Sequence, residues 1–194
     1  MYRFTEPDVL APFDIMMEAT AERFEFRYPE QHAFPDDEAM NFDSEASFYH
    51  PGDEVHPGQL YLLTKHRSDT QTILYEFPSL VGAGKLDLIK IDAFDVGGGD
   101  DWFGGRVTGA DFHTETDRLA VLTYHRILVF DISQRPIRFG TPIASVELVQ
   151  SETQQVEGIA WSGDTLIVLN EQGTLWHLPY GVWSTPGAVF PVGL

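Results

Sequence analysis

Carboxylates at the edges of apolar segments are the first residues in this sequence that could do chemistry. Glu38, Asp111 and Glu157 each lie within or at the start of a short, largely apolar segment. Calcium and magnesium prefer oxygen ligands, so these three side chains are candidate ligands of a hard divalent cation. The alternative is that Glu157, together with Glu171, only marks where strands begin and end, and that the polar side chains around the candidate ligands hold water.

Four further polar residues stand at the ends of comparable segments. Lys65, Tyr124 and Glu171 close apolar runs, and Thr108 opens one. We expect these side chains to contact a ligand if the fold brings the ends of the segments together. For Lys65 and Glu171 there is a second interpretation, which is an ion pair between two units of the fold.

The glycine-rich stretch DVGGGDDWFGG, residues 95–105, resembles a phosphate-binding loop only in composition. It contains neither GxxxxGK[ST] nor a GxGxxG that opens a helix, and the adjacent Asp100 and Asp101 would repel a phosphate. We therefore expect a loop between two units of the fold. Its Trp102 either docks on the protein or forms an exposed contact site for a ligand.

No motif for nucleophilic catalysis occurs in the sequence, which has no cysteine and no GxSxG. The segment 43–58 contains the possible metal ligands His50, Asp53, Glu54 and His56. Histidines and carboxylates at this spacing can bind zinc or nickel, whereas the prolines and glycines among them favour a solvent-exposed loop. We expect the loop.

The net charge of the chain narrows the choice of partners. Thirty Asp and Glu residues against 12 Lys and Arg give a formal charge of −18. Such a surface repels phosphate backbones and anionic lipids, so we expect no nucleic acid and no membrane among the partners. Cations and basic molecules are favoured. Adaptation to high salt is an alternative origin of the acidity, since only three of the basic residues are lysine.

The hydropathy pattern predicts a globular chain with a substantial core, because 43% of the residues are hydrophobic. No run approaches the roughly 18 consecutive apolar residues of a membrane span. The first residues, MYRFTEPDVL, lack a basic segment followed by an apolar stretch. We therefore expect the chain as given to be cytoplasmic.

A group of three apolar segments occurs three times along the chain. Each segment is short, rich in Val, Ile, Leu, Thr and aromatic residues, and bounded by turn residues, as in antiparallel strands joined by hairpins. A fourth strand is expected in LDLIKIDAF, in IASVELV and, more weakly, in GAVFPVG. The three copies are EAMNF, QLYLLTK and TILYEF (38–77), TGADF, RLAVLTY and RILVFDI (108–132), and EGIAW, TLIVLNE and TLWHLP (157–179).

Four strands per copy, repeated along the chain, predict the blades of a β-propeller. The predicted fold class is therefore all-β, with about three four-stranded antiparallel blades in a single domain, residues 1–194. We expect blades at 36–95, 106–149 and 155–194. YRF and ERFEFRY, within residues 1–30, would be two outer strands of a preceding, incomplete blade.

The order YRFTEP, RYPE, DDEAM, GQLYLLTK, VTGADFHTETDRLAVLTY and VEGIAW resembles the C-terminal half of bacterial six-bladed β-propellers of the TolB-like superfamily. The resemblance covers residues 2–179. It departs from the family in two ways, because the family's upstream blades are absent here and Leu122 stands where the VTGAD blade often carries an arginine. Some six-bladed propellers are metal-dependent hydrolases or lactonases, which makes such an enzyme the alternative function.

Strand polarity in a propeller predicts which of the candidate residues meet. The innermost strand of a blade starts on the face where the second strand ends. This face would collect Glu38, Thr108 and Glu157 from first strands, and Lys65, Tyr124 and Glu171 from second strands. We expect this acidic face to hold a ligand, with calcium or magnesium as the possible cofactor.

Three blades and a fragment cannot close a propeller ring, so apolar faces between blades would remain in water. We therefore expect either self-association or pairing with a missing N-terminal half-propeller. The preferred function is a non-catalytic binding or interaction module with an unidentified ligand. A metal-dependent hydrolase, with its ion on Glu38, Asp111 and Glu157, is the alternative.

Overall fold

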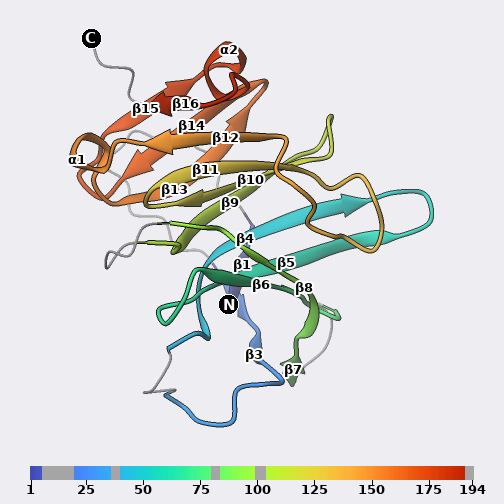
Figure 1. The fold of residues 1–194 in the computed structure, drawn as a ribbon. Helices are drawn as coiled ribbons and strands as arrows, with labels where there is room; N and C mark the ends of the chain where they lie inside the picture. The colour runs from blue at the N-terminus through green and yellow to red at the C-terminus, as the bar shows by residue number, and fades with distance from the viewer. Residues whose placement is uncertain (6–19, 36–39, 80–83, 99–103, 191–194) are drawn as a thin grey trace.

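The computed structural model describes residues 1–5, 20–35, 40–79, 84–98 and 104–190. Strands make up 54% of these residues and helices 5%, so the all-β prediction is confirmed. In Figure 1 the strands from β4 to β8 lie mostly below those from β9 to β16.

The first large sheet contains four antiparallel strands. Residue types alternate along its first strand, so Ala46, Phe48 and His50 are buried and the residues between them are exposed. The buried side chains pack against the second sheet. In spatial order the strands are β4 (Asp43–Gly52), β5 (Pro57–Lys65), β6 (Gln71–Glu76) and β8 (Ile89–Asp95).

The second sheet lies between the first and the third. Its five strands, in chain order, are β9 (Val107–His113), β10 (Arg118–Thr123), β11 (Arg126–Asp131), β12 (Ala144–Leu148) and β16 (Ala188–Phe190). In β10, Leu119 and Val121 belong to the core shared with the first sheet, whereas Ala120 and Leu122 belong to the core on the other side. Burial on both faces explains why this strand is almost continuously apolar.

The third sheet consists of β13 (Val156–Ser162), β14 (Thr165–Asn170) and β15 (Leu175–Leu178). Its first strand, β13, packs against β9, and β9 also packs against β4. The first strands of the three large sheets therefore lie side by side, as Figure 1 shows near its centre. This contact places the ends of neighbouring strands from three sheets close together.

Two small strand pairs accompany the three large sheets in the described part of the chain. β1 (Tyr2–Phe4) and β2 (Ala21–Arg23) are antiparallel, and β3 (Glu25–Arg27) and β7 (Lys85–Asp87) are parallel. Phe26, on β3, packs against a third apolar cluster that includes Tyr75 and Phe77. The pair β3–β7 thus rests on the core, whereas all residues of β1 and β2 are exposed.

Two four-residue helices were not expected from the sequence. They are α1 (Gln150–Thr153) and α2 (Tyr180–Trp183). In the part of the chain that the structure describes, no helix has the length and hydropathy needed to cross a membrane.

The predicted innermost strand of the first unit, EAMNF, is wrong. Its Glu38 lies outside the described residues, and the partner of β5 is β4, which lies in the segment predicted as a loop. The pairing runs from Asp43 opposite Lys65 to Gly52 opposite Pro57. Gly52 allows the tight turn because its φ is +85° and a Cβ atom there would lie 2.3 Å from the carbonyl oxygen of His56.

The weakly predicted fourth strand of the third unit forms, but in a different sheet. β16 lies within GAVFPVG and pairs in parallel with β12, at the outer edge of the second sheet. The connection through α2 carries the chain back across the third sheet, since α2 contacts both β12 and β14. The expected strands in LDLIKIDAF and IASVELV are confirmed as β8 and β12.

Candidate functional site

A chain of hydrogen bonds joins the three large sheets where their first strands meet. Lys65, at the end of β5, donates from Nζ to the Tyr124 hydroxyl at 3.1 Å and to the carboxylate of Glu45 on β4. Tyr124 follows β10 and donates from its hydroxyl to Oε1 of Glu157 on β13 at 2.6 Å. We call Glu45, Lys65, Tyr124 and Glu157 the junction network.

The two central members of the junction network are buried, with 4% of Lys65 and 4% of Tyr124 exposed. Burial lowers the pKa of Lys65, but its hydrogen bonds to Glu45 and Tyr124 outweigh burial and leave the pKa raised. Burial raises the pKa of Tyr124, as does its hydrogen bond to Glu157. Lys65 therefore remains a cation at neutral pH, held between two partners. A lysine bound in this way orders the junction between sheets and is poorly placed to act as a nucleophile.

Thr108 and Glu171 lie beside this network. The Thr108 hydroxyl is buried and donates to the carbonyl oxygen of Val156, one residue before Glu157, at 2.8 Å. Glu171 is exposed just after β14 and donates its backbone N–H to the carbonyl of Gln155 at 3.0 Å. Burial raises the pKa of Glu157, and the negative charges of Glu45 and Glu171 add to this effect.

The expected convergence of strand ends is confirmed for Lys65, Tyr124 and Glu157, which are linked by hydrogen bonds. Their role in ligand binding remains a prediction, as does that of Thr108 and Glu171. Lys65 forms its ion pair with Glu45 rather than with Glu171. Glu45 is not among the predicted site residues, because the prolines and glycines of segment 43–58 indicate a loop. The sequence signal for its strand is the alternation of Ala46 and Phe48 with polar residues.

The predicted metal ligands do not share one site in the described part of the chain. Asp111 accepts the backbone N–H of Trp161 at its Oδ2, over 2.7 Å, and its carbonyl accepts the Trp161 indole N–H at 3.1 Å. Glu157 is bonded instead to Tyr124. Within the described ranges, no group of three or more His, Asp or Glu side chains lies close enough to hold a metal ion. Glu38 and Trp102 fall outside those ranges, so the metal site and the Trp102 contact remain predictions.

Asp53, Glu54 and His56 lie in a tight turn between β4 and β5, whereas His50 lies on β4 itself. Asp53 accepts the backbone N–H groups of Val55 and His56 at 2.7 and 2.8 Å, and its carboxylate lies 3.1 Å from Nδ1 of His56. These hydrogen bonds to the charged form lower the pKa of Asp53 to about 2. The carboxylate thus organises the turn.

We expect Asp53→Asn to be less stable than the wild type at pH 7, with a difference that shrinks between pH 4 and pH 2. A carboxyl group whose pKa is depressed in the folded state stabilises the fold above its unfolded pKa of about 4, and this contribution is lost as the pH falls through the folded value. Urea unfolding at a series of pH values measures the effect. Glu54→Gln, at an exposed neighbouring position, is the control. A difference that stays constant across this pH range would contradict the assignment.

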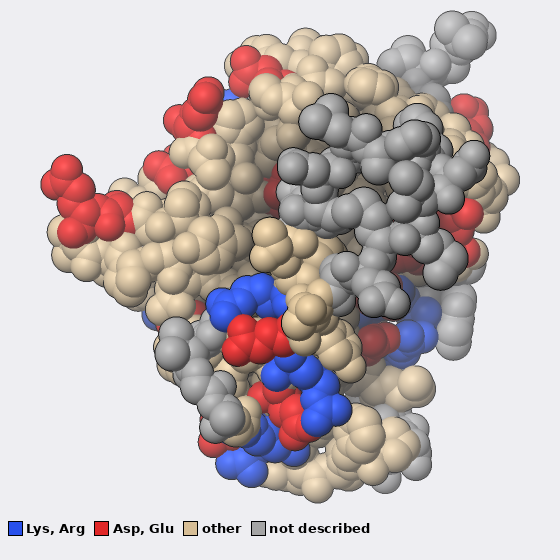
Figure 2. All heavy atoms as spheres, turned by 180° about the vertical axis from the view of Figure 1, so that it is seen from behind, with Lys and Arg blue, Asp and Glu red and all other residues tan. Residues whose placement is uncertain are grey.

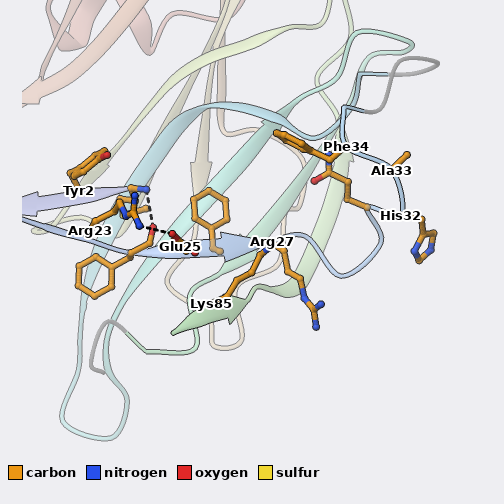
Figure 3. A pocket seen from close by; sticks show the side chains of 12 residues that line it. Tyr2, Arg23, Glu25, Arg27, His32, Ala33, Phe34 and Lys85 are labelled. Atoms are coloured by element: carbon orange, nitrogen blue, oxygen red, sulfur yellow. Dashed lines mark hydrogen bonds and ion pairs between the residues drawn. The ribbon is translucent and has the colours of Figure 1, made fainter. Parts of the chain in front are cut away.

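A wide hollow of about 760 Å³ opens beside β2, β3 and β7. Its apolar lining includes Phe24 and Phe26, and Figure 3 shows Tyr2 and Phe34 at its two sides, with Arg27 and Lys85 between them. Tyr2 is 64% exposed and Phe34 is 93% exposed. We call this hollow the β2–β3 groove.

The charged side chains of the β2–β3 groove differ from the rest of this acidic protein. Arg23, Arg27 and Lys85 line it, with Glu25 as the single acidic side chain of the lining. Arg23 donates to Glu25 at 2.7 Å, and Arg27 binds the Asp87 carboxylate through two nitrogens. Within the described residues, the side chain of Lys85 forms no hydrogen bond or salt bridge. The face in Figure 2 shows basic side chains mostly in its lower part, whereas acidic side chains are also spread around its upper edge.

Two comparisons of this chain with known proteins gave no match. No protein-family model matches it. No curated protein matches it either. The resemblance to TolB-like propellers therefore remains a prediction from the sequence motifs.

Proposed function

We propose that this protein is a non-catalytic binding module with a propeller-like arrangement of blades, and that it binds a second copy of itself through the β2–β3 groove. The observation that carries the proposal is the groove itself, which combines exposed aromatic rings with a basic lining in a chain of net charge −18. The side-by-side first strands β4, β9 and β13 support the blade arrangement.

Charge complementarity favours a second copy as the occupant. Arg23 and Arg27 are paired with Glu25 and Asp87, so Lys85 is the side chain that leaves the lining with a positive charge. The 30 Asp and Glu residues of the chain supply carboxylates that a second copy can present to it. Complementary potentials fix the orientation of two partners as they meet. Lys85 contributes most directly, because no carboxylate within the described residues forms a salt bridge with it.

The strands β1 and β2, beside the groove, also favour association with a partner. Within the described residues β1 and β2 pair only with each other, and every residue in both is exposed. A pair of three-residue strands without a buried face is marginally stable in water. A strand from another molecule can add to such an edge through main-chain hydrogen bonds, while pockets beside the edge take its side chains.

Burial of exposed apolar side chains would stabilise the association of two copies at the β2–β3 groove. Tyr2 and Phe34 flank the groove, and Phe4 on β1 is 57% exposed. Covering apolar surface stabilises a complex by roughly 25 cal/mol per Å². A separate N-terminal half-propeller would use the same surface and is the second partner that the sequence predicts.

No arrangement among the described residues favours the metal-dependent hydrolase alternative. Asp111 and Glu157 bind different partners, the first a backbone N–H on β13 and the second the Tyr124 hydroxyl. A binding role at the groove needs neither a metal nor turnover.

The solution mass of the protein tests this proposal. We expect light scattering at micromolar concentration to give twice the mass of the chain or more. Lys85→Glu should weaken the association at least about tenfold, because it replaces an attractive charge with a repulsive one in the groove. Lys90→Glu is the matched control, since Lys90 is also exposed, on β8, but does not line the groove. Its association constant should stay within about twofold of the wild type.

Two results would refute the proposal. One is a monodisperse wild-type monomer that unfolds cooperatively at micromolar concentration, which would show that the groove needs no second copy. The other is a dimer that Lys85→Glu and Lys90→Glu weaken equally, which would place the interface elsewhere. Circular dichroism of both variants checks that each one is folded.

A further inference from the structure

A second hollow, of about 280 Å³, lies between the β4–β5 hairpin and the loop that follows β11. None of the side chains that line it belongs to the β2–β3 groove or to the junction network. Its size is at the lower end of the range for sites that enclose small molecules. We call it the hairpin pocket, and its polar lining residues are His50, His56, Gln59, Tyr61, Glu76 and Arg135.

The His50 ring lines the hairpin pocket, and its Nε2 atom is buried without a hydrogen-bond partner. Its side chain is only 6% exposed, and its Nδ1 accepts the backbone N–H of Gly52 at 2.9 Å. Burial and the nearby charge of Arg135 lower its pKa, so the ring is neutral at pH 7 and carries its proton on Nε2. Nε2 is buried without a hydrogen-bond partner, and the nearest carboxylate oxygen, on Asp117, is 3.6 Å away. A buried donor left unpaired in this way costs stability until a ligand or water accepts its hydrogen bond.

Arg135 supplies a positive charge to the same pocket. One terminal nitrogen of its guanidinium donates to the carbonyl oxygens of Ile132 and Gln134, at 2.7 and 3.1 Å. Among the residues that the structure describes, Arg135 forms no salt bridge. The carbonyl bonds hold the side chain in place, and the remaining donors of the guanidinium suit a planar carboxylate.

The other side of the hairpin pocket offers acceptors. Tyr61 and Glu76 lie opposite each other on β5 and β6, and burial together with the charge of Glu76 raises the pKa of Tyr61 to about 12. The phenol therefore stays protonated, and Glu76 keeps oxygen lone pairs for a further donor. Gln59 contributes a neutral amide beside it.

We propose that the hairpin pocket binds a small carboxylate that carries a hydrogen-bond donor next to the carboxyl group, such as a short hydroxy acid or amino acid. The carboxylate would bind the guanidinium of Arg135, beside the His50 ring. The hydroxyl or amino group would donate to Glu76 or Gln59. Donors at one end of the pocket and acceptors at the other match this class of ligand, and this inference does not depend on the association through the β2–β3 groove.

Nuclear magnetic resonance of the histidine side chains tests the proposal on the wild-type protein. We expect glycolate or glycine, in the millimolar range, to shift the imidazole signals of His50 saturably and to leave those of His177 unchanged. Ethylene glycol has the size and hydroxyl groups of glycolate without its charge, and it should cause no saturable shift. Comparison of glycolate with glycine shows whether the pocket prefers a hydroxyl or an ammonium group.

Two matched variants make the test specific. Arg135→Gln should weaken glycolate binding at least about tenfold, because the charge-assisted hydrogen bonds to the carboxylate are lost. Arg138→Gln removes an arginine from the same loop that also donates to backbone carbonyls but does not line the pocket, and it should bind as the wild type does. Absence of a saturable shift for both ligands in the wild type would overturn the proposal, and so would undiminished binding by folded Arg135→Gln.

Discussion

Trp183→Ala is expected to lower the free energy of unfolding by about 4 kcal/mol, since truncation of a buried aromatic residue removes apolar contacts and leaves a cavity. Trp183 is 2% exposed on α2, and its ring packs edge-on against Trp161 at 5.4 Å between centroids. Its indole N–H donates to the carbonyl of Asp164 at 2.8 Å. Because α2 contacts both β12 and β14, the Trp183 side chain stabilises the packing of the second sheet against the third. Urea unfolding at pH 7 measures the loss.

Tyr180→Ala is the matched control for this prediction. Tyr180 lies on the same short helix and stacks edge-on with Trp183 at 5.1 Å, but it is 53% exposed. We expect it to cost less than about 1 kcal/mol. If Trp183→Ala and Tyr180→Ala lowered the free energy of unfolding by similar amounts, the packing of α2 between the second and third sheets would be contradicted. The parallel addition of β16 to β12 would then lack its anchor.

The strands of the second sheet were predictable from two features of the sequence, which are the continuous apolar runs and the short turn between them. Arg118–Thr123 and Arg126–Asp131 are continuous apolar runs separated by a short turn, and burial on both faces of the sheet demands that composition. The hairpin spacing then fixes which residues face each other. Local pattern was sufficient here because the pairing is between neighbours in the sequence.

The sequence predicted neither β4 nor the partner of β16, for two different physical reasons. In β4 the buried positions are only Ala46, Phe48 and His50, and the serines, proline and glycine around them have weak strand preference, so turn composition concealed a two-residue alternation. For β16 the sequence predicted the strand but not the strand with which it pairs. A strand of three residues is too short for its hydropathy pattern to show whether it pairs at the edge of the third sheet or at the edge of the second.

The same contrast holds for the sites. Strand polarity predicted the meeting of Lys65, Tyr124 and Glu157, because it depends on topology rather than on exact register. The β2–β3 groove could not be predicted in this way. It depends on the parallel pairing of Arg27 with Asp87, across 60 residues of sequence, and no local pattern encodes such a contact.

Lys65→Ala is expected to lower the free energy of unfolding by about 3 kcal/mol. Removal of one partner from a buried ion pair typically costs 3 to 5 kcal/mol, and the lower value applies because the side chain of Glu45 is 35% exposed and can be solvated by water. The Tyr124 hydroxyl would also lose the donor that binds it at 3.1 Å. Since the pKa of Lys65 is raised in the folded state, its contribution is complete at pH 7 and is lost only when the pH rises above about 10.4, through the folded value. Urea unfolding at pH 7 is therefore the measurement.

Two further substitutions separate the charge of Lys65 from its packing. Lys65→Met keeps an unbranched apolar side chain in the junction and should recover about half of the loss, because the stem of a lysine contributes buried apolar surface. Lys90→Ala removes an exposed lysine on β8 and should change stability by less than about 0.5 kcal/mol. If Lys65→Ala cost no more than Lys90→Ala, the junction network would not be what holds the first strands of the three sheets together. A large loss that Lys65→Met fully restores would assign the effect to packing alone, and the hydrogen bonds to Glu45 and Tyr124 would then contribute little.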